Sequence, residues 1–123
     1  MADDGPWSVR CHQSARDVDR VLTYFAPDAS WQNVPHPPAE GRDEIRSMLA
    51  PILDRSSVVS WDLVTEAYGD ERAWLERIDR FWIDGTEFAV RCNGVLEFDT
   101  RAGVITEIRD YVDLGEWRAR LSW

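Results

Sequence analysis

Residues 74–83 read Trp-Leu-Glu-Arg-Ile-Asp-Arg-Phe-Trp-Ile, and this stretch decides the fold that we expect for the chain. Apolar and polar residues largely alternate along it, which is typical of a β-strand with one face on a core. Alternate side chains of a strand share a face, so Arg77 and Asp79 point the same way as Leu75 and Phe81. A charged pair on that face is costly to desolvate unless its members bind each other, and such pairs are candidates for chemistry. An ordinary ion pair at the edge of the core is the alternative interpretation.

The two-residue period continues on both sides of this stretch and predicts a series of antiparallel strands. The chain turns at Gly69-Asp70, and Asp84-Gly85 is a strong hairpin signal. The further strands expected are 58–68, 86–98 and 104–112. In the last of these, strict alternation places Val104, Thr106, Ile108, Asp110 and Val112 on one face.

Helical periods precede the strands. Ser14 and Asp17 form a capping-box pattern, and it predicts a helix that Pro27 ends. The apolar stripe of this helix would be Val18, Val21, Leu22 and Phe25. A short strand should follow at 29–34, with Trp31 and Asn33 on one face.

A second helix is expected from Gly41, because acidic residues in its first turn suit the helix dipole. Pro51 should kink it. Its buried stripe would be Ile45, Met48, Leu49, Ile52 and Leu53. A second capping-box pattern at 113–116 predicts a short C-terminal helix that carries Trp117.

Helices followed by hairpin-linked strands predict an α+β fold, with helices packed on one face of a bent, mostly antiparallel sheet. A chain of 123 residues suits one domain, residues 1–123, with room for one pocket. A strongly curved sheet folded over helices leaves a conical cavity, where a small-molecule site is expected.

Charge and composition exclude several partners. The net charge of −9 argues against nucleic acid and against anionic membranes. Cys11 and Cys92 match no disulfide or metal pattern and are expected to be free thiols, and His12 and His36 add no ligand spacing, so we expect no metal. With no apolar run of about 20 residues, we expect no membrane span and a cytoplasmic protein.

The last strand, 104–112, also has a charged residue on an apolar face: Asp110 is a carboxylate among apolar side chains, just as Asp79 is in the strand at 74–83. Asn33 supplies a neutral amide that could hold a water. Two carboxylates, an arginine and an amide are the parts of an acid–base site in which one carboxylate is the base and the other the acid. The alternatives are surface pairing of Asp110 with Arg109 or Arg118, and a backbone role for Asn33.

Three stretches of the chain together resemble the signature of the limonene-1,2-epoxide hydrolase family. They are Trp-Gln-Asn-Val-Pro-His-Pro-Pro-Ala-Glu-Gly-Arg-Asp at 31–43, Glu-Arg-Ile-Asp at 76–79 and Arg-Asp-Tyr-Val-Asp-Leu at 109–114. The resemblance implies the cystatin-like, NTF2-like cone, which is shared with SnoaL-type cyclases and ketosteroid isomerases. It also implies a homodimer and a single-step reaction that needs no metal or organic cofactor.

By this resemblance Asp110 is the base that deprotonates the attacking water, and Asp79 is the acid that protonates the epoxide oxygen. Arg77 bridges the two carboxylates, and Asn33 helps to hold the water. Trp31 stands where the family has a water-holding tyrosine, and an indole N–H can donate but not accept a hydrogen bond. The expected function is hydrolysis of a small hydrophobic epoxide to a vicinal diol.

The inward-facing apolar residues Ile52, Leu53, Phe81, Val112 and Trp117 are expected to line the substrate pocket. Two other functions stay open. One is a cyclase or isomerase on the same fold, in which a substrate hydroxyl replaces water, and the other is a non-catalytic ligand-binding module. Trp74, Ile78 and Trp82 share the outer face of their strand and predict the dimer interface.

Overall fold

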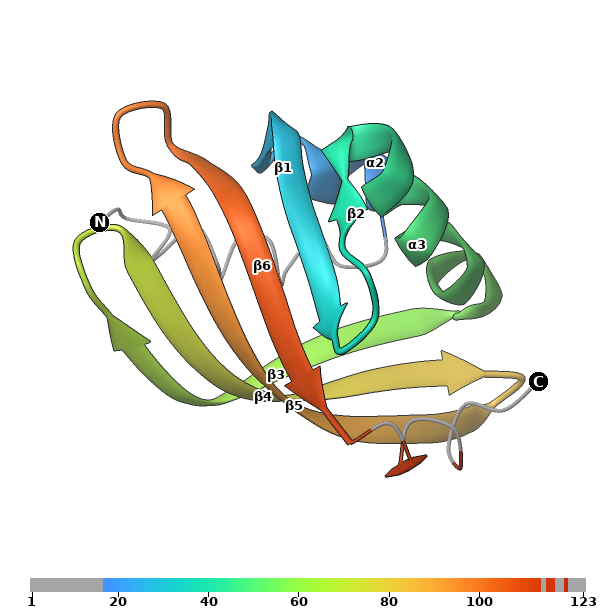
Figure 1. Ribbon diagram of the computed structural model, residues 1–123. Helices are drawn as coiled ribbons and strands as arrows, with labels where there is room; N and C mark the ends of the chain where they lie inside the picture. Colours follow the sequence, from blue (N-terminus) through green and yellow to red (C-terminus); the bar gives the residue numbers. More distant parts are fainter. Residues whose placement is uncertain (1–16, 114, 117–118, 120–123) are drawn as a thin grey trace.

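Six strands form one strongly bent sheet in this computed structural model, which describes residues 17–113, 115–116 and 119 (Figure 1). The strand order is β2-β1-β6-β5-β4-β3. The β1–β6 pair is parallel and the four other pairs are antiparallel. In chain order the elements are α2 (Val18–Leu22), β1 (Phe25–Val34), β2 (Ala39–Glu40), α3 (Gly41–Arg55), β3 (Val58–Tyr68), β4 (Arg72–Ile83), β5 (Thr86–Asp99) and β6 (Val104–Val112).

Both described helices lie over the concave side of the sheet, so the expected α+β arrangement with a mixed, mostly antiparallel sheet is confirmed (Figure 1). Strand β4 alternates along its whole length between buried inner residues and less buried outer ones. Its inner face is Ala73, Leu75, Arg77, Asp79, Phe81 and Ile83. The hairpin after it turns at Asp84 and Gly85, which both have positive φ, as a two-residue primed turn requires.

The first helix is shorter than its apolar stripe predicted. It covers Val18–Leu22, and Asp17 is its N-cap, with a carboxylate that accepts from the Arg20 backbone N–H. The expected cap, Ser14, lies outside the described residues. Phe25 is buried as expected but begins β1, so the strand predicted at 29–34 starts four residues earlier. Pro27 lacks a backbone N–H and sits where the β1–β6 register is irregular, so no regular ladder bond is lost there.

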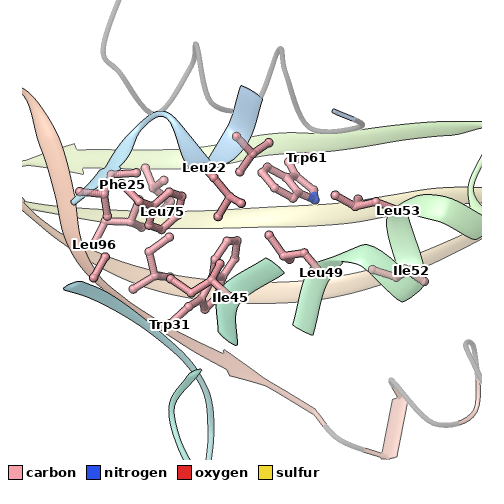
Figure 2. Packing of buried hydrophobic residues seen from close by; sticks show 14 of the residues in the cluster. Leu22, Phe25, Trp31, Ile45, Leu49, Ile52, Leu53, Trp61, Leu75 and Leu96 are labelled. Atoms are coloured by element: carbon pink, nitrogen blue, oxygen red, sulfur yellow. The ribbon is translucent and has the colours of Figure 1, made fainter. Parts of the chain in front are cut away.

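Helix α3 covers the sheet with the stripe that its sequence predicted. Ile45, Leu49, Ile52 and Leu53 are buried, and Met48 packs on the same core while half-buried. Figure 2 shows the side chains of this helix among the buried residues that the sheet strands contribute. Pro51 lies inside the helix, which nevertheless continues to Arg55. Neither described helix has the length and apolar character of a membrane span.

The face assignment of β6 is correct at one end and wrong at the other. Ile108 and Asp110 point inward as expected, but Thr106 is exposed and its neighbour Ile105 is buried. The β5–β6 register shifts at this point, since Glu97 pairs with Glu107 while Phe98 pairs with Ile105. A bulge of one residue reverses which side chains face the core, so strict alternation fails across it.

Candidate active site

Arg77 lies between Asp79 and Asp110 and binds both carboxylates. Its Nε and Nη2 donate to Asp79 over 2.7 and 3.2 Å. Its Nη1 and Nη2 donate to Asp110 over 3.1 and 2.8 Å. All three side chains are buried. Strand β4 supplies two members and β6 the third, with β5 between these two strands. Arg77 and Asp79 thus form the ion pair of the alternative interpretation, but the pair is buried rather than at the edge of the core, and the arginine joins a second buried carboxylate.

Trp31 adds a further donor to Asp110. Its indole Nε1 donates to Asp110 Oδ2 over 2.9 Å, across the parallel β1–β6 pair. The ring is held in place because it stacks on Phe25, with centroids 5.6 Å apart, and meets Trp61 edge-on at 6.1 Å. An indole N–H can only donate, so this contact requires an acceptor oxygen on Asp110. Trp31 thus contacts the candidate base directly.

The charges of the site support one another. Burial disfavours the positive charge of Arg77, but the attraction of Asp110 and Asp79 is stronger in sum and holds the pKa of Arg77 well above its ordinary value. With both carboxylates ionised the three groups carry one net negative charge. A single proton bound to either carboxylate would make the set neutral, which is the state that an acid–base pair of this kind needs.

Cys92 on β5 also contacts Asp110. Burial raises the pKa of the Cys92 thiol, and the negative charge of Asp110 raises it further, so the thiol is protonated at neutral pH. The free-thiol interpretation of Cys92 is confirmed. Cys11 lies outside the described residues. Asp110 accepts from Arg77 and Trp31, and both contribute donor groups, which suits a carboxylate that acts as a base.

A cavity of about 160 Å³ lies against this set and is lined mostly by apolar side chains. Four of the five predicted substrate-binding residues line it: Ile52, Leu53, Phe81 and Val112. The fifth, Trp117, lies outside the described residues. All five predicted catalytic residues also line the cavity, namely Trp31, Asn33, Arg77, Asp79 and Asp110. The polar groups therefore converge on one wall of an apolar pocket.

Asn33 lies directly beside Asp110, since the two residues are register partners in β1 and β6. Its amide Nδ2 contacts the thioether sulfur of Met48 over 3.7 Å. Asn33 lines the same cavity as the two carboxylates. The position is suitable for holding a water near Asp110.

Sequence reasoning missed several residues of the site. Trp61, on the inner face of β3, lines the cavity and supports Trp31. Trp61 is the register partner of Asp79, so the two side chains share the inner face. The period-two alternation that identified Arg77 could also have identified Trp61. Met48 was assigned only to the core. Cys92 could be expected to be buried, but its contact with Asp110 depends on strand register.

The alternative partner proposed for Asp110 on its own strand is not used. Arg109 points away from Asp110 and binds Glu97, over 2.7 Å, and Glu107. The other alternative partner, Arg118, lies outside the described residues. Within the described part of the chain, no group of three or more His, Cys, Asp or Glu residues is placed to hold a metal ion.

The chain belongs to the SnoaL-like domain family, whose sequence profile matches residues 10–108. Its fold is the NTF2-like cone that the resemblance implied. An NTF2-like protein from Burkholderia pseudomallei is 18% identical, with a TM-score of 0.79 and 100% of each chain covered.

Two similar structures carry names that bear on chemistry. A Mycobacterium tuberculosis LEH-like epoxide hydrolase is 22% identical, with a TM-score of 0.76, and the match covers 94% of this chain and 86% of that one. The epoxide hydrolase/cyclase-like enzyme SalBIII, which has a role in pyran ring formation in the polyether salinomycin, is 14% identical, with a TM-score of 0.77 and 89% of each chain covered. At these identities the likeness is one of fold, and the chemistry of this chain must be argued from its own site.

Proposed function

We propose that this protein is an epoxide hydrolase that adds water to a small hydrophobic epoxide in one acid–base step, without metal or organic cofactor. The observation that carries the proposal is the Arg77 guanidinium bound to both Asp79 and Asp110 on the wall of an apolar cavity. The arrangement offers a base and an acid on one rigid support, which is what concerted opening of an epoxide requires. The fold is also that of an LEH-like epoxide hydrolase, so it can carry a site of this kind.

In the proposed step Asp110 takes a proton from a water, and the oxygen of that water attacks one epoxide carbon. The bond from that carbon to the epoxide oxygen breaks, and Asp79 gives its proton to the departing oxygen. The product is a vicinal diol. Asp110 then carries the proton that it took from the water, while Asp79 has given its own proton to the product, and transfer of one proton from Asp110 to Asp79 restores the starting state. Asn33 holds the water, and Arg77 keeps the two carboxylates in a fixed position relative to each other.

The donors around Asp110 favour this division of labour. Asp110 accepts from Trp31 as well as from Arg77, so its oxygens are held as acceptors. We therefore assign the base to Asp110 and the acid to Asp79. Because one group must be ionised and the other protonated, turnover is expected to follow a bell-shaped curve in pH, whose two limbs belong to the coupled pair.

The cavity limits the size of the substrate. At about 160 Å³ it is smaller than most ligand sites, which measure roughly 300–1,000 Å³. Its walls include Trp31, Trp61 and Phe81, which suit a compact apolar skeleton. We expect monocyclic epoxides such as cyclohexene oxide or styrene oxide to be accepted and a steroid epoxide to be rejected.

A second candidate function is epoxide-opening cyclisation, in which a hydroxyl of the substrate attacks in place of water. One observation favours it: Trp31 donates directly to Asp110 at the position where the resembling family has a water-holding tyrosine. A substrate that supplies its own nucleophile would not need that water site. The similar fold of SalBIII is consistent with such chemistry.

The test is a screen of cyclohexene, styrene, terpene and steroid epoxides for diol formation in ¹⁸O-labelled water, with Asp110→Asn as the blank. We expect one labelled oxygen per diol with the parent and none above background with the blank. A cyclic ether without label, formed from a hydroxy-epoxide, would replace the hydrolase by the cyclase. If no substrate reacts and Asp79→Asn and Asp110→Asn alter only stability, the chain is a ligand-binding module.

A further inference from the structure

Strand β5 lies between β4 and β6 and passes directly under the contact between Arg77 and Asp110. Gly94 on this strand is the register partner of Asp110 on one side and of Leu75 on the other. It is buried and lies inside β5. A glycine in the interior of a strand weakens the strand, because glycine loses more conformational entropy on folding than other residues and has no side chain to pack. Its presence there calls for a physical reason.

Backbone conformation does not supply that reason. Gly41, Gly85 and Gly103 have positive φ, whereas Gly94 does not. Any residue could adopt the backbone of Gly94. The reason must instead lie in the space that a side chain at position 94 would occupy.

A Cβ atom built on Gly94 would lie 2.6 Å from Asp110 Oδ1 and 2.7 Å from Arg77 Nη1. These are the two atoms that form one of the Arg77–Asp110 hydrogen bonds, 3.1 Å long. Both distances are well inside van der Waals contact, so at least one of the side chains would have to move. Movement of either side chain would disturb a second interaction, because Trp31 also binds Asp110 and Asp79 also binds Arg77.

We infer that Gly94 is a positioning residue of the proposed active site: its missing side chain lets Arg77 and Asp110 meet in the geometry that the reaction requires. The inference deepens the proposed function and rests on it where turnover is concerned. Strand β5 carries no member of the proposed acid–base pair, but through Gly94 it would determine how the Asp110 carboxylate is oriented. A methyl group at this position should displace the base by a few tenths of an ångström or more, and small misplacements of catalytic groups reduce the rate steeply.

The test compares Gly94→Ala with Gly69→Ala. A Cβ on Gly69 would meet only ordinary contacts, the nearest at 3.6 Å from the carbonyl oxygen of Arg72, so this control carries the same chemical change without crowding. On an epoxide that the parent hydrolyses, Gly94→Ala should lower kcat about 10²-fold with a much smaller change in KM. Gly69→Ala should stay within about twofold of the parent in both constants, since the added methyl touches no group of the site. Parental kcat in Gly94→Ala would overturn the inference.

A second readout does not depend on turnover. The indole ¹H–¹⁵N resonance of Trp31, assigned by its loss in Trp31→Phe, reports the hydrogen bond to Asp110. It should move in Gly94→Ala and stay in place in Gly69→Ala. If the parent opens no epoxide, the proposed function fails while this measurement still decides the role of Gly94. An unchanged Trp31 resonance in Gly94→Ala would contradict it.

A third comparison applies if Gly94→Ala folds poorly. Asp110→Ala removes Oδ1 and releases one hold on Arg77, so the added methyl would have room. Gly94→Ala should then lower the melting temperature less in the Asp110→Ala background than in the parent, because part of the crowding has been removed. An equal loss in the two backgrounds would show that crowding against Asp110 is not why position 94 is glycine.

Discussion

Trp31 and Asp110 are 79 residues apart in the sequence, yet the indole Nε1 of one lies 2.9 Å from a carboxylate oxygen of the other. The contact joins the hydrophobic core to the candidate base, because Trp31 is also stacked on Phe25 and packed against Trp61. Core packing therefore fixes the direction of the Asp110 carboxylate. A change in the aromatic core should consequently alter the chemistry of the site.

The first prediction concerns this contact. Trp31→Phe keeps an aromatic ring but removes the donor, so Asp110 loses one of its holds and kcat should fall. Trp31→Tyr also frees volume beside Asp110 and brings a hydroxyl that can donate and accept, so its kcat should equal or exceed that of the parent. Both variants lose packing and should unfold about 1–3 kcal/mol more easily in urea. Equal kcat values for Phe and Tyr would show that the hydroxyl does not serve the water.

The second prediction concerns the two carboxylates. Asp79→Asn and Asp110→Asn keep shape but remove proton transfer, so each should lower kcat about 10²-fold or more. Asp84→Asn is the matched control, because it makes the same change at an exposed hairpin position whose positive φ asparagine tolerates. Steady-state kinetics on an accepted epoxide give the answer. Near-parental turnover in both site variants would remove the assignment of acid and base.

The third prediction concerns the guanidinium. Arg77→Lys keeps the charge but cannot reproduce hydrogen bonds from one planar group to two carboxylates, so kcat should fall at least about tenfold. Arg80→Lys is the control, since Arg80 also joins two carboxylates, Asp62 and Glu87, but on the outer, more exposed side of the same strand. Its kcat should be unchanged. An equal effect of the two substitutions on kcat would argue against a special role for the buried Arg77 guanidinium.

The fourth prediction is a pH dependence of stability. The pKa of Cys92 is raised in the folded protein, mainly by burial. An unfolded thiol ionises above about pH 8.5, so the stability that the neutral thiol contributes is complete below that pH and is lost as the pH rises above it. The parent should lose about 1.4 kcal/mol per pH unit more than Cys92→Ala between pH 9 and 10.

The chain makes this measurement clean, because its 14 basic residues are all arginine and no lysine titrates in that range. Urea unfolding at a series of pH values provides the free energies. Cys92→Ser serves as a second variant, because it replaces the thiol by a hydroxyl donor that does not ionise near pH 9. Parallel stability curves for the parent and both variants would contradict the prediction.

The fifth prediction is a homodimer through the outer sheet face. Trp74 is 45% exposed, Val64 56% and Tyr111 49%, and Ile78 lies half-buried on the same side of β4 as Trp74. An apolar surface of this kind is suited to association with a second copy of the chain. Light scattering should give the mass of a dimer for the parent and for Thr100→Arg at an exposed turn, and a monomer for Ile78→Arg. A stable parental monomer at micromolar concentration would remove the idea.

Much of the fold follows from local patterns in the sequence. The alternation along β4 placed Arg77 and Asp79 on the inner face, and the Asp84-Gly85 pair marked the hairpin where it occurs. Strand β3 was predicted with its observed ends, Val58 and Tyr68. These features depend on the period of side chains along one segment and on the φ values that a turn demands, and both are properties of neighbouring residues.

Other features were decided by tertiary structure. The segment after Leu22 has a helical apolar stripe, yet it pairs with β6 and becomes β1, because pairing and burial outweigh a short helical signal. The bulge at Thr106 reversed the alternation of β6, and nothing in the strand itself announces it. Local propensity cannot anticipate a contact that depends on how two strands are set against each other.

The candidate site shows the same division. The alternation along β4 and along the second half of β6 indicated that Arg77, Asp79 and Asp110 face inward, and so the sequence by itself supplied these three residues. Only the tertiary structure decided that Trp31 binds Asp110, that the Cys92 thiol is buried near its charge and that Gly94 leaves room for the Arg77–Asp110 pair. The physical reason is that a face is fixed by the period of one strand, whereas a distance between strands is fixed by their register, which depends on the packing of the whole sheet.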